Sequence, residues 1–182
     1  LEYNSHPDYK EKTIIVVGGG NVAMDTARAI KRLGAKKVIV VYRRAREQMP
    51  AEQKEIEDAI KEGVEFLFQN NIVKIIGEKK VEGVELIKTE LVKKEEEKRL
   101  SPINVENSNY QIKADGIVTA IGSHPAEFVK SLELEIDKKG NIKVNKNGQT
   151  SNPRIYAIGD LAGNIQTVAW AARSGRDVAE KI

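Results

Sequence analysis

Residues 14–23, Ile-Ile-Val-Val-Gly-Gly-Gly-Asn-Val-Ala, join an apolar run to three glycines and the start of a helical pattern. The run Ile14–Val17 predicts a buried strand, which the glycines end. Within the stretch, Gly18, Gly20 and Ala23 have the G-x-G-x-x-G/A spacing that is typical of a dinucleotide site. The sequence therefore predicts a strand, a tight turn and a helix that together bind a dinucleotide.

Each small residue of this spacing has its own physical role. Gly18 allows the tight turn, and Gly20 lets the backbone approach a pyrophosphate, because a Cβ there would occupy the space of the phosphate. Ala23 is small enough for the helix to lie close to the strand. The N–H groups at the helix start, with the positive end of the helix dipole, then face the phosphates. The predicted cofactor-binding residues of this loop are Gly18, Gly19, Gly20, Asn21, Val22 and Ala23.

The flanking sequence supports the dinucleotide site. The helical pattern ends at Gly34, a residue type that commonly terminates helices, and the apolar run Val38–Tyr42 follows. These elements make one strand–helix–strand unit of about 30 residues, as the fingerprint requires. The alternative is a tight strand-to-helix turn that binds no ligand.

The end of the second apolar run indicates which dinucleotide binds. An acidic residue there would accept hydrogen bonds from the ribose of NAD and would repel a 2′-phosphate. Residues 42–46 are instead Tyr-Arg-Arg-Ala-Arg, and the next carboxylate is Glu47. Arginine side chains suit a phosphate dianion, and an aromatic or guanidinium plane can stack on adenine. The sequence thus favours NADP(H) over NAD(H), with Arg43 and Arg44 on the 2′-phosphate; the alternative is a solvated basic loop.

Composition limits the classes of protein to which the chain can belong. Its 182 residues, 40% of them hydrophobic, suit one large domain or one domain with part of another. The 30 basic residues nearly balance the 27 acidic ones, so the net charge of +3 does not favour a nucleic-acid partner. The absence of cysteine excludes disulfides, iron–sulfur ligation and a redox-active thiol pair in this chain. His6 and His124 lie far apart in the sequence, so we expect no metal site.

The sequence indicates neither a membrane segment nor secretion. No apolar stretch approaches the roughly 20 residues that span a bilayer, and the N-terminus lacks a signal-peptide pattern. We therefore expect a cytoplasmic protein without a membrane partner.

The order of the patterns predicts an α/β protein with a Rossmann-like, three-layer NAD(P)-binding domain and a β-meander. Residues 1–12 are polar and predict a leader or linker, residues 50–62 a second helix, and residues 64–68 a third strand. The next apolar runs have no helix between them and should form an antiparallel meander: residues 72–76, 81–89 and 110–114. The later patterns predict a strand and glycine turn at 115–122, a hairpin at 134–144, a short strand at 155–158 and a helix at 167–182.

Two further motifs follow the glycine loop in order: Thr-Ala-Ile-Gly at 119–122 and Ile-Tyr-Ala-Ile-Gly-Asp at 155–160. Together with residues 42–44 and 48–51, they resemble the small (beta) subunit of NADPH-dependent glutamate synthase. Related flavoproteins share the pattern, including the NADPH-to-flavin part of dihydropyrimidine dehydrogenase and the large subunit of NADH-dependent ferredoxin:NADP reductases. The resemblance covers residues 12–182.

The resemblance implies two domains, because this family inserts an NAD(P)H domain into a FAD domain. Residues 13–122 would then form the NAD(P)H-binding domain, and residues 123–182 the C-terminal segment of the FAD-binding domain. Ile121 and Gly122 would lie beside the dinucleotide. Gly159 and Asp160 match the residues that bind the FAD ribitol and pyrophosphate. Residues of the next helix start match the region beside the flavin, where the helix dipole would stabilise negative charge: Gln166, Thr167 and Val168.

The resemblance also implies an activity: hydride passes from NADPH to FAD, and the cofactors supply the chemistry. We expect no catalytic residue in this chain. The family's first FAD fingerprint and its iron–sulfur segment would lie upstream of Leu1, so we expect the chain alone to be inactive and to hold FAD poorly. The expected partners are that N-terminal portion and a large glutamate synthase-type or other electron-accepting subunit. The alternative is a non-catalytic NAD(P)-sensing module, which needs no flavin half-site.

Overall fold

The computed structural model describes residues 7–93, 100–122, 127–138, 140–163, 165 and 167–182. The chain divides into two compact units, Leu1–Gly122 and Ser123–Ile182, and each is described by itself. Among the described residues, no helix combines the length and the apolar character that a bilayer span needs.

A four-stranded parallel sheet forms the centre of the first unit. Its strands lie in the order β3-β2-β1-β8, with bounds Glu65–Phe68, Lys37–Tyr42, Thr13–Val17 and Gly116–Thr119. Every neighbouring pair is parallel. The carboxyl ends of all four strands therefore lie at one edge of the sheet, which is where ligands bind in open α/β sheets.

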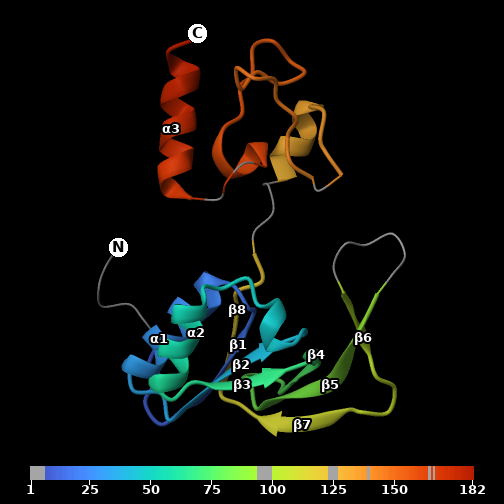
Figure 1. The fold of residues 1–182 in the computed structure, drawn as a ribbon. Coiled ribbons are helices and arrows are strands. Elements are labelled where there is room, and N and C mark those ends of the chain that lie inside the picture. The colour runs from blue at the N-terminus through green and yellow to red at the C-terminus, as the bar shows by residue number, and fades with distance from the viewer. Residues whose placement is uncertain (1–6, 94–99, 123–126, 139, 164, 166) are drawn as a thin grey trace. The chain divides into compact units, whose positions relative to one another are not determined.

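Two helices cover one face of this sheet, α1 (Asn21–Arg32) and α2 (Gln53–Lys61) (Figure 1). Ile14 and Val16 of β1 point into the core beneath them, which also contains Met24 of α1 and Ile56 of α2. The helices are joined on their outer side by Arg28 and Arg32 of α1. Arg28 forms ion pairs with Glu55, Asp58 and Glu62, and Arg32 forms one with Glu62.

A second sheet covers the other face of the parallel sheet. It contains β4 (Asn70–Ile76), β5 (Gly83–Val92), β6 (Ser101–Asn104) and β7 (Tyr110–Lys113), and its pairs are antiparallel. Ile15 of β1 packs here against Val84 and Leu86 of β5. Neighbouring residues of β1 thus enter different cores, which explains why its sequence is continuously apolar. The unit has three layers: helices, parallel sheet and antiparallel sheet.

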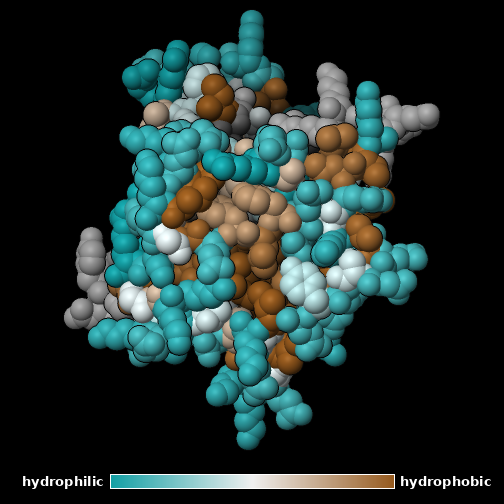
Figure 2. All heavy atoms as spheres, turned by 60° about the horizontal axis from the view of Figure 1, so that its bottom comes forward, coloured by the Kyte–Doolittle hydropathy of each residue, from teal (hydrophilic) through white to brown (hydrophobic). Residues whose placement is uncertain are grey.

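The surface of the molecule also carries apolar residues. When the part that lies lowest in Figure 1 is turned forward, hydrophobic side chains gather in the middle of the face and hydrophilic ones surround them (Figure 2). Val73 and Ile75 of β4 are among the exposed large apolar residues of the first unit. Single exposed apolar residues are ordinary on protein surfaces and carry no functional argument alone.

The second unit contains two 3₁₀ segments, η2 (Glu127–Leu132) and η3 (Gly159–Ala162), and the helix α3 (Val168–Ala179). Its small core contains Val129, Ile142 and Ala157. The turn before Ile142 is stabilised by Asp137, whose carboxylate accepts a hydrogen bond from the Asn141 N–H at 2.9 Å.

The predicted α/β class, with a Rossmann-like layer and a meander, is confirmed, and several element bounds differ from expectation. The second helix begins at Gln53 and not at residue 50, and residues 46–48 form the 3₁₀ segment η1 (Arg46–Gln48). The expected hairpin at 134–144 has a single bridge, between Ile136 and Ile142, and the expected strand at 155–158 has one bridge, from Tyr156 to Gln149. Strand β6 was not predicted. The run at residues 93–99 alternates blocks of both charges and predicts a solvated hairpin tip, and its residues 94–99 lie outside the described residues.

Candidate dinucleotide-binding site

The glycine loop follows the carboxyl end of β1, where Gly18 fills the narrowest position. Gly18 has a φ of +146°, and a Cβ there would overlap the carbonyl oxygen of Ala120. The same Cβ would lie 3.3 Å from the Cβ of Ala23, which is fully buried at the start of α1. Gly18 therefore packs between α1 and the segment after β8, so both its backbone conformation and its surroundings require glycine.

Gly19 lies against the ring of Tyr42, the last residue of β2. A Cβ on Gly19 would stand 2.5 Å from Cε2 of that ring. The Tyr42 hydroxyl donates a hydrogen bond to the carbonyl of Gln48 at 2.7 Å. The Ala51 N–H donates in turn to the carbonyl of Gly19 at 3.1 Å. The Tyr42 ring thus connects the glycine loop to the segment before α2 and is occupied by protein contacts.

Gly20 is the N-cap of α1 and has open space beside it. Its backbone is extended, and the nearest atom to a Cβ there would be Cγ of Pro50, at 4.0 Å. No side chain caps this helix start, and its first turn contains no acidic residue. The first N–H groups of a helix lack intrahelical acceptors, so the open space and the uncapped N-terminus together fit a phosphate group.

The next two loop residues have different environments. The side-chain oxygen of Asn21 accepts a hydrogen bond from the Glu52 N–H at 2.8 Å, which fixes the start of α2 beside the start of α1. Val22 is 68% exposed. The Asn21 side chain therefore stabilises the protein fold, whereas Val22 presents an exposed apolar side chain beside the glycine loop.

The arginine segment follows the carboxyl end of β2, one strand away from the glycine loop. Arg43 is exposed and Arg44 is half-buried. Nε of Arg44 is buried and has no hydrogen-bond partner among the described residues. A buried donor without a partner is costly, so Arg44 fits a site in which an anion supplies the acceptor.

Ile121 and Gly122 follow the carboxyl end of β8, the other neighbour of β1. Ile121 is 76% exposed. Gly122 has a φ of +100°, and no atom of the described residues lies within 4 Å of a Cβ built on it. Because β2, β1 and β8 are parallel neighbours, the structure brings three of the predicted segments to one edge of the sheet: residues 18–23, 43–44 and 121–122.

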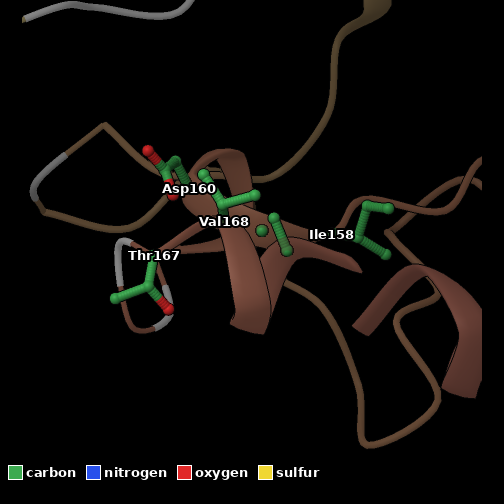
Figure 3. A pocket seen from close by; sticks show the side chains of 6 residues that line it. Ile158, Asp160, Thr167 and Val168 are labelled. Atoms are coloured by element: carbon green, nitrogen blue, oxygen red, sulfur yellow. The ribbon is translucent and has the colours of Figure 1, made fainter. Parts of the chain in front are cut away.

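The second unit has a hollow of about 360 Å³ at the start of α3. Side chains of Asp160, Thr167 and Val168 lie on one side of it and that of Ile158 on the other (Figure 3). Gly159 is buried with a φ of +58°, and a Cβ there would lie 3.1 Å from the Cβ of Ala171 in α3. Glycine thus allows η3 to approach α3 closely.

The helix start beside this hollow is capped by the protein itself. The hydroxyl of Thr167 accepts a hydrogen bond from the Trp170 N–H at 3.2 Å. Val168 is 88% exposed, and Asp160 is also exposed. Gln166, the remaining predicted residue of this group, lies outside the described residues. A carboxylate and an exposed helix start beside an open hollow fit the sugar and phosphate parts of a nucleotide cofactor.

Sequence reasoning missed the residues that hold the arginine segment. The Thr89 hydroxyl donates to the carbonyl of Arg43, and the Gln69 N–H donates to the carbonyl of Arg44. Thr89 lies 46 positions from Arg43, and no motif spacing connects them. The sequence offers a single indication, a threonine within the strand pattern of residues 81–89, and this indication does not identify the group that the hydroxyl contacts. Among the described residues, no three histidine or acidic side chains gather as a metal site.

A family model described as pyridine nucleotide-disulphide oxidoreductase matches residues 2–175 of this chain. The chain belongs to this family.

Curated relatives include small chains of NADPH glutamate synthase, and the resemblance inferred from the motifs is confirmed. That of Halomonas elongata is 38% identical over 93% of this chain and 37% of its own length. That of Escherichia coli K12 is 36% identical over 94% of this chain and 38% of its own length. The beta subunit of an NADP(+)-dependent formate dehydrogenase from Moorella thermoacetica is 35% identical over the whole chain and 26% of its own length. The chain thus spans less than two fifths of the length of these relatives.

Solved structures show the same fold at lower sequence identity. A thioredoxin reductase of T. acidophilum has a TM-score of 0.77 and 24% identity, covering 94% of this chain and 52% of its own. FprA of Mycobacterium tuberculosis in complex with NADPH has a TM-score of 0.73 and 19% identity, covering 96% of this chain and 53% of its own. These likenesses establish the fold.

Proposed function

We propose that this chain is the NADPH-docking part of a flavoprotein oxidoreductase that passes hydride from NADPH to FAD. The observation that carries the proposal is the placement of two segments at adjacent strand ends. The open space beside Gly20 faces an uncapped helix start, and Arg44 has a buried Nε without a partner among the described residues. The first suits the pyrophosphate of a dinucleotide, and the second suits its 2′-phosphate.

Each protein group has a separate task in this proposal. The first-turn N–H groups of α1 bind the pyrophosphate, while Gly18 and Gly19 keep the loop close to the sheet. Arg43 and Arg44 bind the 2′-phosphate and so discriminate against NAD(H). Ile121 and Gly122 lie at the same sheet edge and border the dinucleotide. No side chain of the site has to move a proton for a hydride transfer.

We further propose that residues 13–122 are the NAD(P)H-binding domain and that residues 123–182 contribute to a FAD-binding domain. The hollow beside Gly159, Asp160, Thr167 and Val168 supports this assignment, because an open hollow at a helix start suits part of a nucleotide cofactor. When bound, FAD would accept the hydride at its flavin ring. An electron-accepting subunit would then receive the electrons from FAD.

The test is a pair of titrations followed by a spectrum. Isothermal titration of the purified chain should show binding of NADP⁺ that is stronger than binding of NAD⁺. The chain alone should show no bound flavin in its visible spectrum and no NADPH-oxidising activity with an artificial acceptor. No binding of either dinucleotide would overturn the proposal. Preference for NADP⁺ without flavin binding in the longer protein would instead favour an NADP-sensing module.

A further inference from the structure

The main chain of the arginine segment is held by the second sheet. The Thr89 hydroxyl of β5 donates a 2.8 Å hydrogen bond to the carbonyl of Arg43. The Gln69 N–H, at the junction of β3 and β4, donates a 3.1 Å hydrogen bond to the carbonyl of Arg44. Two consecutive carbonyl groups are thus held from outside the segment, one by β5 of the antiparallel sheet and one by the turn between β3 and β4.

Gln69 and Thr89 are themselves connected. The Thr89 N–H donates to the carbonyl of Gln69 at 2.8 Å. Gln69 has a φ of +54°, a left-handed conformation that non-glycine residues rarely adopt. This conformation turns the chain from β3 into β4 and keeps the Gln69 N–H directed at the arginine segment. Thr89 is 5% exposed, so water does not replace its hydroxyl easily.

The two arginine side chains have no comparable support. Within the part of the chain that the structure describes, neither Arg43 nor Arg44 forms a side-chain hydrogen bond or an ion pair. The position of each guanidinium therefore depends on its own rotamers and on the main chain to which it is attached. Charge-assisted hydrogen bonds from arginine to phosphate are directional, so a displaced main chain would weaken them.

We propose that Thr89 is a positioning residue for cofactor choice: its hydroxyl fixes the Arg43 peptide and thereby sets the preference for a 2′-phosphate. This inference rests on the proposed function, since it assumes that the arginines bind that phosphate. Thr89 does not touch the cofactor in this account. Its effect reaches NADP(H) through Arg43 and is absent for NAD(H), which lacks the group that the arginines bind.

The experiment compares Thr89→Val with Thr89→Ser in the full chain. Valine keeps the shape and removes the hydroxyl, whereas serine keeps the hydroxyl. We expect Thr89→Val to lower the ratio of NADP⁺ affinity to NAD⁺ affinity by roughly three- to tenfold in isothermal titration, and Thr89→Ser to keep the wild-type ratio. A general loss of folding would lower both affinities together. If the valine variant does not fold, Thr89→Cys, with a weak donor of similar size, should give an intermediate ratio.

A double-mutant comparison tests the route of the effect. In a chain that also carries Arg43→Ala and Arg44→Ala, adding Thr89→Val should leave the affinity ratio unchanged, because no arginine remains to be positioned. An unchanged ratio for Thr89→Val in the wild-type background, while the wild type prefers NADP⁺, would overturn this inference alone. A wild type without preference for NADP⁺ would overturn the proposed function itself.

Discussion

The ring of Tyr42 lies so close to Gly19 that a Cβ on this glycine would stand 2.5 Å from ring atom Cε2. The glycine at the middle of the loop is therefore explained by a protein contact. Gly20, one residue later, has no atom nearer than 4.0 Å to the same hypothetical Cβ. Glycine is needed at position 19 to make room for a side chain of the protein, whereas at position 20 the space beside it is open. Substituting each glycine by alanine distinguishes these two roles.

Gly19→Ala should destabilise the protein. The added methyl must displace the Tyr42 ring, which weakens its hydrogen bond to Gln48. We expect the free energy of unfolding to fall by about 1–3 kcal/mol, the usual range for overpacking. Urea denaturation followed by circular dichroism measures it. Unchanged stability would mean that the ring does not rest on the loop.

Gly20→Ala is the matched control, because it should impair dinucleotide binding more than it impairs folding. The methyl enters open space, but Gly20 is the N-cap of α1, where alanine is less favourable than glycine, so the unfolding free energy should fall by no more than about 1 kcal/mol. The same methyl would occupy space that the pyrophosphate needs, so titration should show weaker binding of both NADP⁺ and NAD⁺. Full binding by this variant would place the phosphates elsewhere.

Tyr42→Phe isolates the hydroxyl from the ring. The packing against Gly19 stays, while the carbonyl of Gln48 loses the hydrogen bond that it accepts at 2.7 Å. The unfolding free energy should fall by about 0.5–1.5 kcal/mol, the net value of one such bond. Chemical denaturation checks this prediction. A loss as large as that of Gly19→Ala would show that the hydroxyl, and not the ring, dominates the contact.

The ion pairs between α1 and α2 predict a response to acid. Hydrogen bonding from Arg32, followed by that from Arg28, lowers the pKa of Glu62 from 4.5 to about 2. A carboxyl with a lowered pKa in the folded state stabilises it fully above pH 4.5, and this stabilisation is lost as the pH falls through about 2. Glu62→Gln should therefore flatten the decline of the thermal midpoint between these values. Glu106→Gln, which changes an exposed carboxylate in a turn, should leave the decline as in wild type.

Much of the fold could be predicted from the sequence because the parallel strands are buried on both faces. Residues 14–17 and 38–42 therefore read as continuous apolar runs, and glycines mark where the chain turns. Strand β6 shows no such pattern. Among the strands that the structure describes it pairs with β5 alone, and it is partly exposed and contains Pro102, which an edge strand tolerates. The expected hairpin at 134–144 forms as an isolated bridge between Ile136 and Ile142 around an Asp137 turn, and its arms are too irregular to count as strands.

Only part of the candidate site could be predicted from the sequence. The glycine spacing and the arginines stand in the sequence as local motifs, and parallel strand order brings their segments to one edge. The contact of Tyr42 with Gly19 and the bond from Thr89 to Arg43 depend on tertiary packing between elements 23 and 46 positions apart. No local pattern encodes them, so only the structure reveals that the second sheet supports the arginine segment.

If this chain binds NADP(H) through its 2′-phosphate, Arg43→Ala with Arg44→Ala should remove its preference for NADP⁺ over NAD⁺. Each lost charge-assisted contact should weaken NADP⁺ binding by about 1–3 kcal/mol in isothermal titration, with NAD⁺ binding nearly unchanged. Lys146→Ala with Arg154→Ala, which removes two exposed positive charges of the second unit, is the charge-matched control and should leave both affinities as in wild type. Equal losses for NADP⁺ and NAD⁺ in the double variant would contradict the account.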